Sequence, residues 1–144
     1  MYEKHSFGRH EIVSKSNQIP NPEILVLHGA GKSDMSRVEF ILDYYEKKQI
    51  GAITFDFVGH GQSTGELSQS SLSERRELAE FFLNKLSPKS RTVMAFSMSG
   101  HTAISLLNGK DNMIKNLALF CPGLYHDAAE SLKFNQGFSD VIRA

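Results

Sequence analysis

A chain of 144 residues is long enough for one domain with a buried core. Its 16 basic and 16 acidic residues balance, so charge gives no reason to expect nucleic acid or an anionic membrane as a partner. Cys121 is the single cysteine, which excludes an intrachain disulfide and predicts a buried apolar side chain. There is no apolar leader and no membrane-spanning run, so we expect a soluble cytoplasmic protein.

The first half of the chain predicts a weak strand or hairpin, then a strand, a helix and a second strand. Alternating apolar residues around 7–13 favour the hairpin. The continuous apolar runs 24–27 and 52–55 are typical of strands buried on both faces. Between them, Ser36-x-x-Glu39 fits a capping box that opens a helix. One apolar helical face follows, formed by Val38, Ile41, Leu42 and Tyr45.

The second half continues the alternation of helix and strand. Ser71-x-x-Glu74 predicts the start of another helix. The apolar positions of that helix are Leu72, Leu78, Phe82 and Leu86. The run 93–96 then predicts a strand, a helix begins at Met98, and a last strand covers 116–120.

This order predicts an α/β fold, a three-layer sandwich in which a mostly parallel sheet lies between layers of helices. The connections between parallel strands should be right-handed. Functional sites in such sheets gather beyond the carboxyl ends of the strands. Residues 28–31, residues 56–63 and Ser97 each follow a predicted strand directly. We therefore expect these three segments to meet at one edge of the sheet.

Ser97 is the strongest candidate for chemistry, because a tight turn places it between a strand and a helix. The sequence around it, Ala-Phe-Ser-Met-Ser, is small-x-Ser-x-small, a variant of the Gly-x-Ser-x-Gly turn that presents a nucleophilic serine. Backbone N–H groups of Met98 and Ala30 could stabilise the oxyanion that develops in acyl transfer. The spacing also suits a serine that only caps a helix, and the pattern alone does not separate the two interpretations.

A phosphate-binding loop is a sharp alternative for residues 31–33. Gly31-Lys-Ser resembles the end of a P-loop, and the strand that ends in Asp56 resembles one that holds magnesium. A P-loop needs an earlier glycine at the position where this chain has Val26, inside a strand. The loop is too short to wrap phosphates, so nucleotide binding is the weakest alternative.

The remaining candidate residues are histidines, and we expect structural hydrogen bonds for them. These histidines are His28, His60, His101 and His126. His60, between two glycines, could also act as a base. No histidine pair has a metal-ligand spacing and Cys121 is isolated, so we expect no metal and no other cofactor.

Three segments together resemble the α/β-hydrolase superfamily, and most closely its monoacylglycerol lipase-like and serine aminopeptidase-like branch. Residues 27–31 resemble the oxyanion loop, residues 55–63 resemble the D-x-x-G-H-G-x-S loop, and residues 96–100 resemble the F-S-M-G-G elbow. The resemblance implies that Ser97 is the nucleophile and that the N–H groups of Ala30 and Met98 form the oxyanion hole. It also implies a group of site-edge residues, namely His28, Gly29, Asp56, Gly59, His60, Gly61 and Ser63.

The resemblance implies a triad in the order serine, acid, histidine, with the last two on later strands. His126, Asp127 and Asp140 follow Ser97, but none of them follows a strand that should carry such a residue. We expect the triad acid and histidine to lie outside residues 1–144. Residues 1–144 are then the N-terminal part of a single α/β-hydrolase domain, truncated after the strand 116–120, with 122–144 the start of a lid.

Three functions remain open from the sequence. The first is a serine hydrolase that cleaves a small-molecule ester or amide through an acyl-enzyme on Ser97. The second is a binding or interaction module that keeps the fold without the chemistry, and the third is the P-loop nucleotide binder. A sheet that ends at strand 116–120 leaves an open edge, which favours a homodimer or aggregation.

Overall fold

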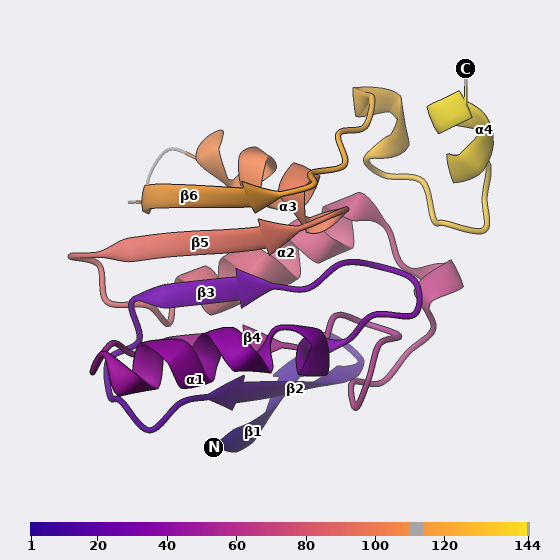
Figure 1. Cartoon of the computed structure of the whole chain (residues 1–144). Coiled ribbons are helices and arrows are strands. Elements are labelled where there is room, and N and C mark those ends of the chain that lie inside the picture. The colour runs from indigo at the N-terminus through magenta and orange to yellow at the C-terminus, as the bar shows by residue number, and fades with distance from the viewer. Residues whose placement is uncertain (110–113, 144) are drawn as a thin grey trace.

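A six-stranded, mostly parallel sheet organises the chain (Figure 1). The computed structural model describes residues 1–109 and 114–143. The strands are β1 (Tyr2–Phe7), β2 (His10–Ser16), β3 (Ile24–Leu27), β4 (Ala52–Phe55), β5 (Arg91–Phe96) and β6 (Ile114–Phe120). Their order in the sheet is β1-β2-β4-β3-β5-β6. Strand β2 runs antiparallel to both of its neighbours, β1 and β4, and strands β3, β4, β5 and β6 are parallel to one another. The predicted α/β class and the N-terminal hairpin are confirmed.

Helices cover both faces of the sheet and give it three layers (Figure 1). The helices are α1 (Glu39–Lys47), α2 (Leu72–Leu83), α3 (Ser99–Leu107) and α4 (Phe138–Arg143), with 3-10 turns at Met35–Arg37, Leu67–Gln69 and Asp127–Ala129. Helix α1 lies on one face, and α2 and α3 lie together on the other. None of the helices in the described ranges has both the length and the apolar character needed to cross a bilayer.

Two apolar clusters, one on each face, hold these layers together. The α1 side is packed by Ile24, Val26, Val38, Ile41, Leu42 and Ala52. The larger cluster on the α2–α3 side includes Leu25, Phe55, Phe57, Leu78, Phe82, Val93 and Ala103. Strands β3 and β4 are buried at every position, which explains why their sequences are continuous apolar runs.

The two predicted helix caps have different outcomes. Ser71 Oγ accepts a hydrogen bond from the N–H of Glu74 at 3.2 Å, so the cap of α2 is confirmed. The capping box predicted at Ser36 is wrong. Asp34 accepts hydrogen bonds from both the N–H and the hydroxyl of Ser36, so that hydroxyl is occupied. Helix α1 instead begins at Glu39 without a side-chain cap.

Cys121 is exposed, so the prediction that it is buried is wrong. It lies in the turn after β6 with a left-handed φ of +46°. Hydrogen bonds hold this turn on both sides, from Ser97 N–H to the Phe120 carbonyl at 3.0 Å and from Gly123 N–H to the Ser97 carbonyl at 2.8 Å. These bonds fix the turn at the surface, outside the apolar clusters.

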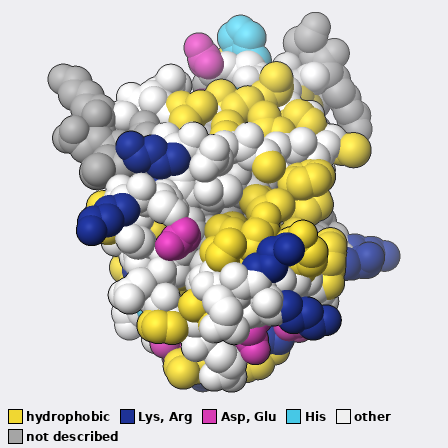
Figure 2. All heavy atoms as spheres, turned by 60° about the vertical axis from the view of Figure 1, so that its left-hand side comes forward, with side chains coloured by type: hydrophobic (Ala, Val, Ile, Leu, Met, Phe, Trp, Pro, Cys, Tyr) yellow, Lys and Arg dark blue, Asp and Glu magenta, His cyan; other side chains and the backbone are white. Residues whose placement is uncertain are grey.

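Apolar surface is also open on the α1 side of the sheet. A hollow of about 390 Å³ is lined by Phe40, Ile41, Tyr44, Tyr45, Met94, Phe96 and Phe120. The rings of Phe96 on β5 and Phe120 on β6 stack with centroids 4.5 Å apart. Seen in space-filling form, the molecule carries a broad band of hydrophobic side chains on one side (Figure 2). The sheet therefore has apolar area in excess of what α1 covers.

Replacement of Phe82 by alanine should strongly destabilise the fold. Phe82 is fully buried, and its ring stacks on Phe55 at 4.2 Å between centroids. We expect Phe82→Ala to lower the free energy of unfolding by about 3–5 kcal/mol, measured by urea titration. Phe40→Ala, at a residue that is 65% exposed, is the matched control and should change stability by about 0.5 kcal/mol or less. Equal losses in the two variants would contradict this account of the core.

Candidate active site

Ser97 occupies a strained turn between β5 and α3. Its φ of +53° lies in the left-handed region, which residues other than glycine rarely adopt. Its N–H donates to the Phe120 carbonyl, and its carbonyl accepts from Gly100 N–H at 2.9 Å and from Gly123 N–H at 2.8 Å. The backbone is fixed in this way while the residue itself is exposed. The alternative of a helix-capping serine is wrong, because no side chain caps α3.

Glycines allow two segments to lie directly against this turn. A Cβ atom on Gly29 would lie 3.3 Å from Ser97 Cβ and 3.9 Å from Ser97 Oγ, so the loop after β3 contacts the serine. A Cβ atom on Gly100 would lie 2.5 Å from Pro122 Cβ, a contact that real Cβ atoms do not make. Gly100 therefore admits the segment after β6.

The two predicted oxyanion donors flank Ser97 from different elements. Ala30 follows Gly29 in the loop that contacts Ser97, and Met98 is the next residue along the turn. In the residues that the structure describes, neither backbone N–H has a hydrogen-bond acceptor within the protein. Both N–H groups are therefore open to a ligand.

Asp56 organises the loops at this edge of the sheet. Its carboxylate accepts hydrogen bonds from the N–H of Met35 at 2.7 Å and of Gln62 at 2.8 Å. Burial raises the pKa of the Asp56 carboxyl, while these two N–H groups oppose the shift. The Ser63 hydroxyl donates to the Asp56 carbonyl at 2.6 Å and accepts from Val13 N–H at 2.9 Å. Asp56 and Ser63 thus tie the glycine-rich loop to the 3-10 turn that precedes α1 and to β2.

The remaining loop residues support the same turn. Gly59 donates its N–H to the Thr64 carbonyl at 3.0 Å. Gly61 lies so close to the Asp56 carboxylate that a side chain there would overlap it. The structure therefore brings all the residues predicted around Ser97 to one edge of the sheet, as the positions of the strand ends required.

Two buried histidines lie in these loops, and both are hydrogen-bonded as predicted. His28 Nδ1 lies 2.6 Å from the Gly29 carbonyl, and its Nε2 accepts from Phe57 N–H at 3.3 Å, which places the single ring proton on Nδ1. Burial and then the charge of Arg75 lower the pKa of His28 to about 3. His60 Nδ1 lies 3.0 Å from the Val58 carbonyl, and burial lowers its pKa as well. Both rings are neutral at physiological pH.

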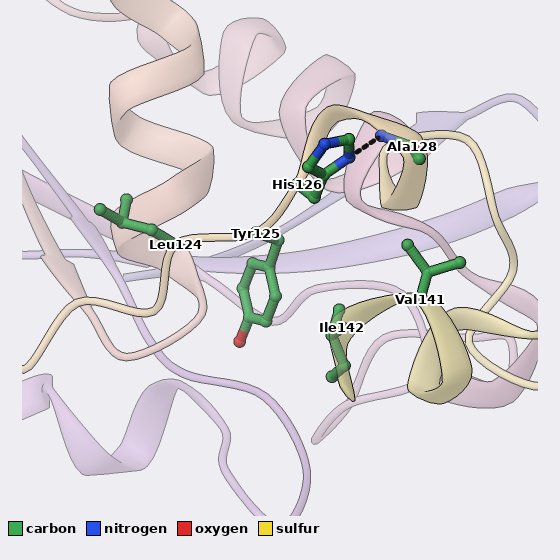
Figure 3. A pocket seen from close by; sticks show the side chains of 6 residues that line it. All are labelled: Leu124, Tyr125, His126, Ala128, Val141 and Ile142. Atoms are coloured by element: carbon green, nitrogen blue, oxygen red, sulfur yellow. Dashed lines mark hydrogen bonds between the residues drawn. The ribbon is translucent and has the colours of Figure 1, made fainter. Parts of the chain in front are cut away.

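The other two predicted histidines hold the segment that follows β6. His101 Nε2 on α3 lies 2.7 Å from Glu130 Oε1, and its Nδ1 accepts from Tyr125 N–H at 3.2 Å. His126 Nδ1 accepts from Ala128 N–H at 3.1 Å, as the dashed line in Figure 3 shows. These are structural hydrogen bonds, so the prediction for these residues is confirmed.

A hollow of about 490 Å³ opens within that segment (Figure 3). It is lined by Leu124, Tyr125, His126, Ala128, Val141 and Ile142, the last two from α4. Its first residue, Leu124, directly follows Gly123, which is hydrogen-bonded to Ser97. Met98 packs into the apolar cluster beneath the segment, with Leu72, Ala129 and Phe138. The hollow therefore adjoins the Ser97 turn, and it is largely apolar.

Sequence reasoning missed Arg75 and the role of Ser99. Arg75 Nη2 donates to Ser99 Oγ at 2.9 Å and to the His28 carbonyl at 3.4 Å. Its guanidinium carbon lies 3.7 Å from the centre of the Phe57 ring. A signal was present in the spacing, because Arg75 lies three residues after Leu72 and three before Leu78, on the apolar face of α2.

The arrangement has neither the P-loop geometry nor a cluster of metal ligands. Helix α1 begins at Glu39, well beyond Ser33, so its N-terminus does not follow the loop directly as phosphate binding requires. Within the described ranges no group of three or more histidine, cysteine, aspartate or glutamate side chains could hold a metal ion.

Solved structures of α/β hydrolases share this fold. The thioesterase domain from the curacin biosynthetic pathway superposes with a TM-score of 0.76 at 19% identity, over 88% of this chain and 48% of that one. A monoacylglycerol lipase of Paleococcus ferrophilus superposes with a TM-score of 0.66 at 19% identity, over 77% of this chain and 43% of that one. The fold is therefore that of the α/β hydrolases.

Sequence comparison identifies the family within the α/β hydrolases to which the chain belongs. A protein of Acanthamoeba polyphaga mimivirus, named as an alpha/beta hydrolase, is 28% identical over 98 residues, which is 67% of this chain and 37% of the viral protein. Residues 18–141 match the family described as serine aminopeptidase, S33. The chain belongs to this family of hydrolases. It spans about half or less of the length of these three proteins.

Acid should destabilise the protein through its buried histidines. Unfolded His28 binds a proton below pH 6.5, whereas folded His28 does so only near pH 3. The unfolded state therefore holds more protons between these values, and the free energy of unfolding falls as pH is lowered through this window. The slope for one such histidine is up to about 1.4 kcal/mol per pH unit.

Urea titrations at several pH values between 5 and 7.5 would measure this slope. His28→Asn should reduce it, since one of the groups that must be protonated on unfolding is gone. His126→Asn, at an exposed histidine outside the buried pair, is the control and should leave the slope as in the native protein. An unchanged slope in His28→Asn would show that His28 does not carry the effect.

Proposed function

We propose that this chain carries the nucleophile of a serine hydrolase that cleaves an ester or amide bond in a small molecule. The observation that supports this most is Ser97 itself, an exposed serine held at a φ of +53° between β5 and α3. A strained strand–turn–helix of this kind directs a serine hydroxyl away from the sheet edge. Membership in a hydrolase family agrees with this role.

In the proposed reaction Ser97 Oγ attacks the carbonyl carbon of the substrate while a base takes its proton. The N–H groups of Ala30 and Met98 stabilise the oxyanion of the tetrahedral intermediate. The intermediate collapses as the base returns the proton to the leaving alcohol or amine, which gives an acyl-enzyme on Ser97. Water then hydrolyses the acyl-enzyme by the same steps and releases the acid.

We infer that the base for Ser97 comes from outside the described residues. His28 and His60 are buried and bonded to backbone carbonyls, and His101 is engaged by Glu130. We propose that residues 1–144 are the N-terminal part of the hydrolase domain and that its acid and histidine lie beyond them. We also propose that residues 122–144 begin a lid, whose apolar hollow favours an uncharged acyl group.

A fluorophosphonate probe tests Ser97 as the nucleophile. We expect the probe to label Ser97, detected by mass spectrometry of the tryptic peptide, in a protein that contains this chain together with the missing acid and histidine. Ser97→Ala should abolish labelling, and residues 1–144 alone should label at least about 100-fold more slowly, because no base activates the hydroxyl. Labelling that persists in Ser97→Ala would overturn the assignment.

A second candidate function, a binding module, is favoured by the open edge of the sheet. Strand β6 ends the sheet order, and Phe120 on it is exposed beside the apolar hollow that α1 borders. An edge strand with free backbone groups and adjacent apolar surface promotes pairing with a second chain. We propose that this edge forms a homodimer when residues 1–144 stand alone.

Phe120→Asp should weaken this association, because it places a charge at the apolar edge. We expect residues 1–144 to form dimers or larger species by multi-angle light scattering, and Phe120→Asp to lower the mass at equal concentration. Leu107→Asp, at an exposed residue of α3, is the control and should leave the mass unchanged. A monodisperse monomer of residues 1–144 at all concentrations would contradict the proposed dimer.

A further inference from the structure

A buried arginine without a carboxylate partner lies beneath the proposed nucleophile. Arg75 on α2 is 1% exposed. Its Nε and Nη1 atoms make no hydrogen bond with any described residue, and no described carboxylate lies within 4.0 Å of it. A buried charge without a counter-charge costs stability, so its presence calls for a role other than stability.

The contacts that Arg75 does make lead to the Ser97 turn. Arg75 Nη2 donates to Ser99 Oγ and to the His28 carbonyl. Ser99 is fully buried and donates its own proton to the same His28 carbonyl. The next residue along that loop is Gly29, whose backbone contacts Ser97. One carbonyl thus joins helix α2, helix α3 and the loop that carries the proposed oxyanion donor.

Ser99 has a specific part in this network. It stands where the usual elbow pattern has glycine, and a glycine has no hydroxyl to bridge Arg75 and His28. The departure from the pattern therefore adds two hydrogen bonds under the turn. Both bonds fix the loop of His28 to Ala30 relative to Ser97.

We propose that Arg75 is a positioning residue of the site, which fixes the loop beside Ser97 through Ser99 and His28 and keeps a positive charge close to the loop that carries the proposed oxyanion donor. This inference deepens the proposed function and rests on it. The charge is preorganised, since packing on Phe57 and the two hydrogen bonds hold it before any substrate arrives.

The surrounding groups leave this charge uncompensated. Burial lowers the pKa of Arg75 to about 9, so the guanidinium is charged at neutral pH. His28 and His60, which face it, are neutral, and Tyr125 is the third titratable group near it. The Asp56 carboxylate lies 3.9 Å from His28 Nε2 and is engaged by backbone N–H groups. Asp34 is a second carboxylate that acts on His28 and His60, but neither Asp34 nor Asp56 forms an ion pair with Arg75, so the guanidinium contributes a positive field at this edge.

A thiol at position 97 measures this field without any need for the missing histidine. In a Ser97→Cys chain, with Cys121→Ser to remove the exposed native thiol, the rate of alkylation by iodoacetamide between pH 5.5 and 9.5 gives the thiol pKa. We expect Arg75→Met to raise this pKa by about one pH unit, because the buried positive charge that is bonded to the nearby His28 carbonyl is lost. Arg75→Lys keeps the charge and should restore most of the shift.

Arg76→Met is the matched control. Arg76 is the next residue of α2 and lies partly exposed at a hollow with Ser73, Glu77 and Glu80. Arg76→Met removes one positive charge from the solvent side of α2, whereas Arg75→Met removes one from its buried side. We therefore expect the thiol pKa of Arg76→Met to stay close to that of the parent chain. Ser99→Ala leaves Arg75 in place but removes the bridge, and should raise the thiol pKa by a smaller amount.

Thermal unfolding separates positioning from a structural role. If Arg75 served only packing, every neutral variant at this position would be less stable than the parent protein. Because Arg75→Met removes an unpaired buried charge, we expect its melting temperature to be unchanged or higher. The proposal is overturned if the thiol pKa of folded Arg75→Met equals that of Arg76→Met. It is also overturned if Arg75→Met and the second neutral variant, Arg75→Gln, both fail to fold while Arg75→Lys folds.

The outcome is independent of the test of the proposed function. Fluorophosphonate labelling that persists in Ser97→Ala would overturn the assignment of Ser97 as the nucleophile. That result would leave the thiol pKa values unaffected. An unshifted thiol pKa with normal labelling would instead keep the nucleophile and remove Arg75 from the site.

Discussion

The site depends on the two backbone hydrogen bonds that tie residue 97 to the segment after β6. They run from Ser97 N–H to the Phe120 carbonyl and from Gly123 N–H to the Ser97 carbonyl. A left-handed serine is costly alone, by about 1–3 kcal/mol, and persists because neighbouring strands dictate its backbone. The parallel pairing of β5 with β6 is thus what holds the serine out of the sheet edge.

Around that turn the protein buries polar side chains at positions where an ordinary core would have apolar ones. His28, Asp56, Arg75 and Ser99 are each at most 1% exposed. Backbone N–H and carbonyl groups satisfy most of their polar atoms, and the loops are fixed as a consequence. Arg75 is the exception, with two nitrogen atoms unsatisfied among the described residues. Rigidity at this edge therefore comes with an electrostatic cost that the apolar clusters below have to offset.

Much of the fold could be predicted, because strands that are buried on both faces of the sheet have continuous apolar sequences. Runs 24–27 and 52–55 are apolar at every position, and both became central strands. The convergence of the three loops followed from the strand ends alone. The failures at Ser36 and Cys121 concern local geometry: a competing acceptor two residues away, and a turn fixed by distant hydrogen bonds. Arg75 was missed because its contacts lie far off in sequence, on His28 and Ser99.

The bond between Gly123 and Ser97 also constrains motion. The chain up to Gly123 is part of the turn, so a hinge that preserves Ser97 can lie only after it. Farther along, Glu130 is held by the ring of His101 and by the N–H and hydroxyl of Ser73. Displacement of the segment would break these hydrogen bonds of Glu130 with His101 and Ser73. It would leave the backbone hydrogen bonds of Ser97 intact. The lid proposed for residues 122–144 would therefore have its hinge after Gly123, and its displacement would change access to Ser97 without changing the backbone of that residue.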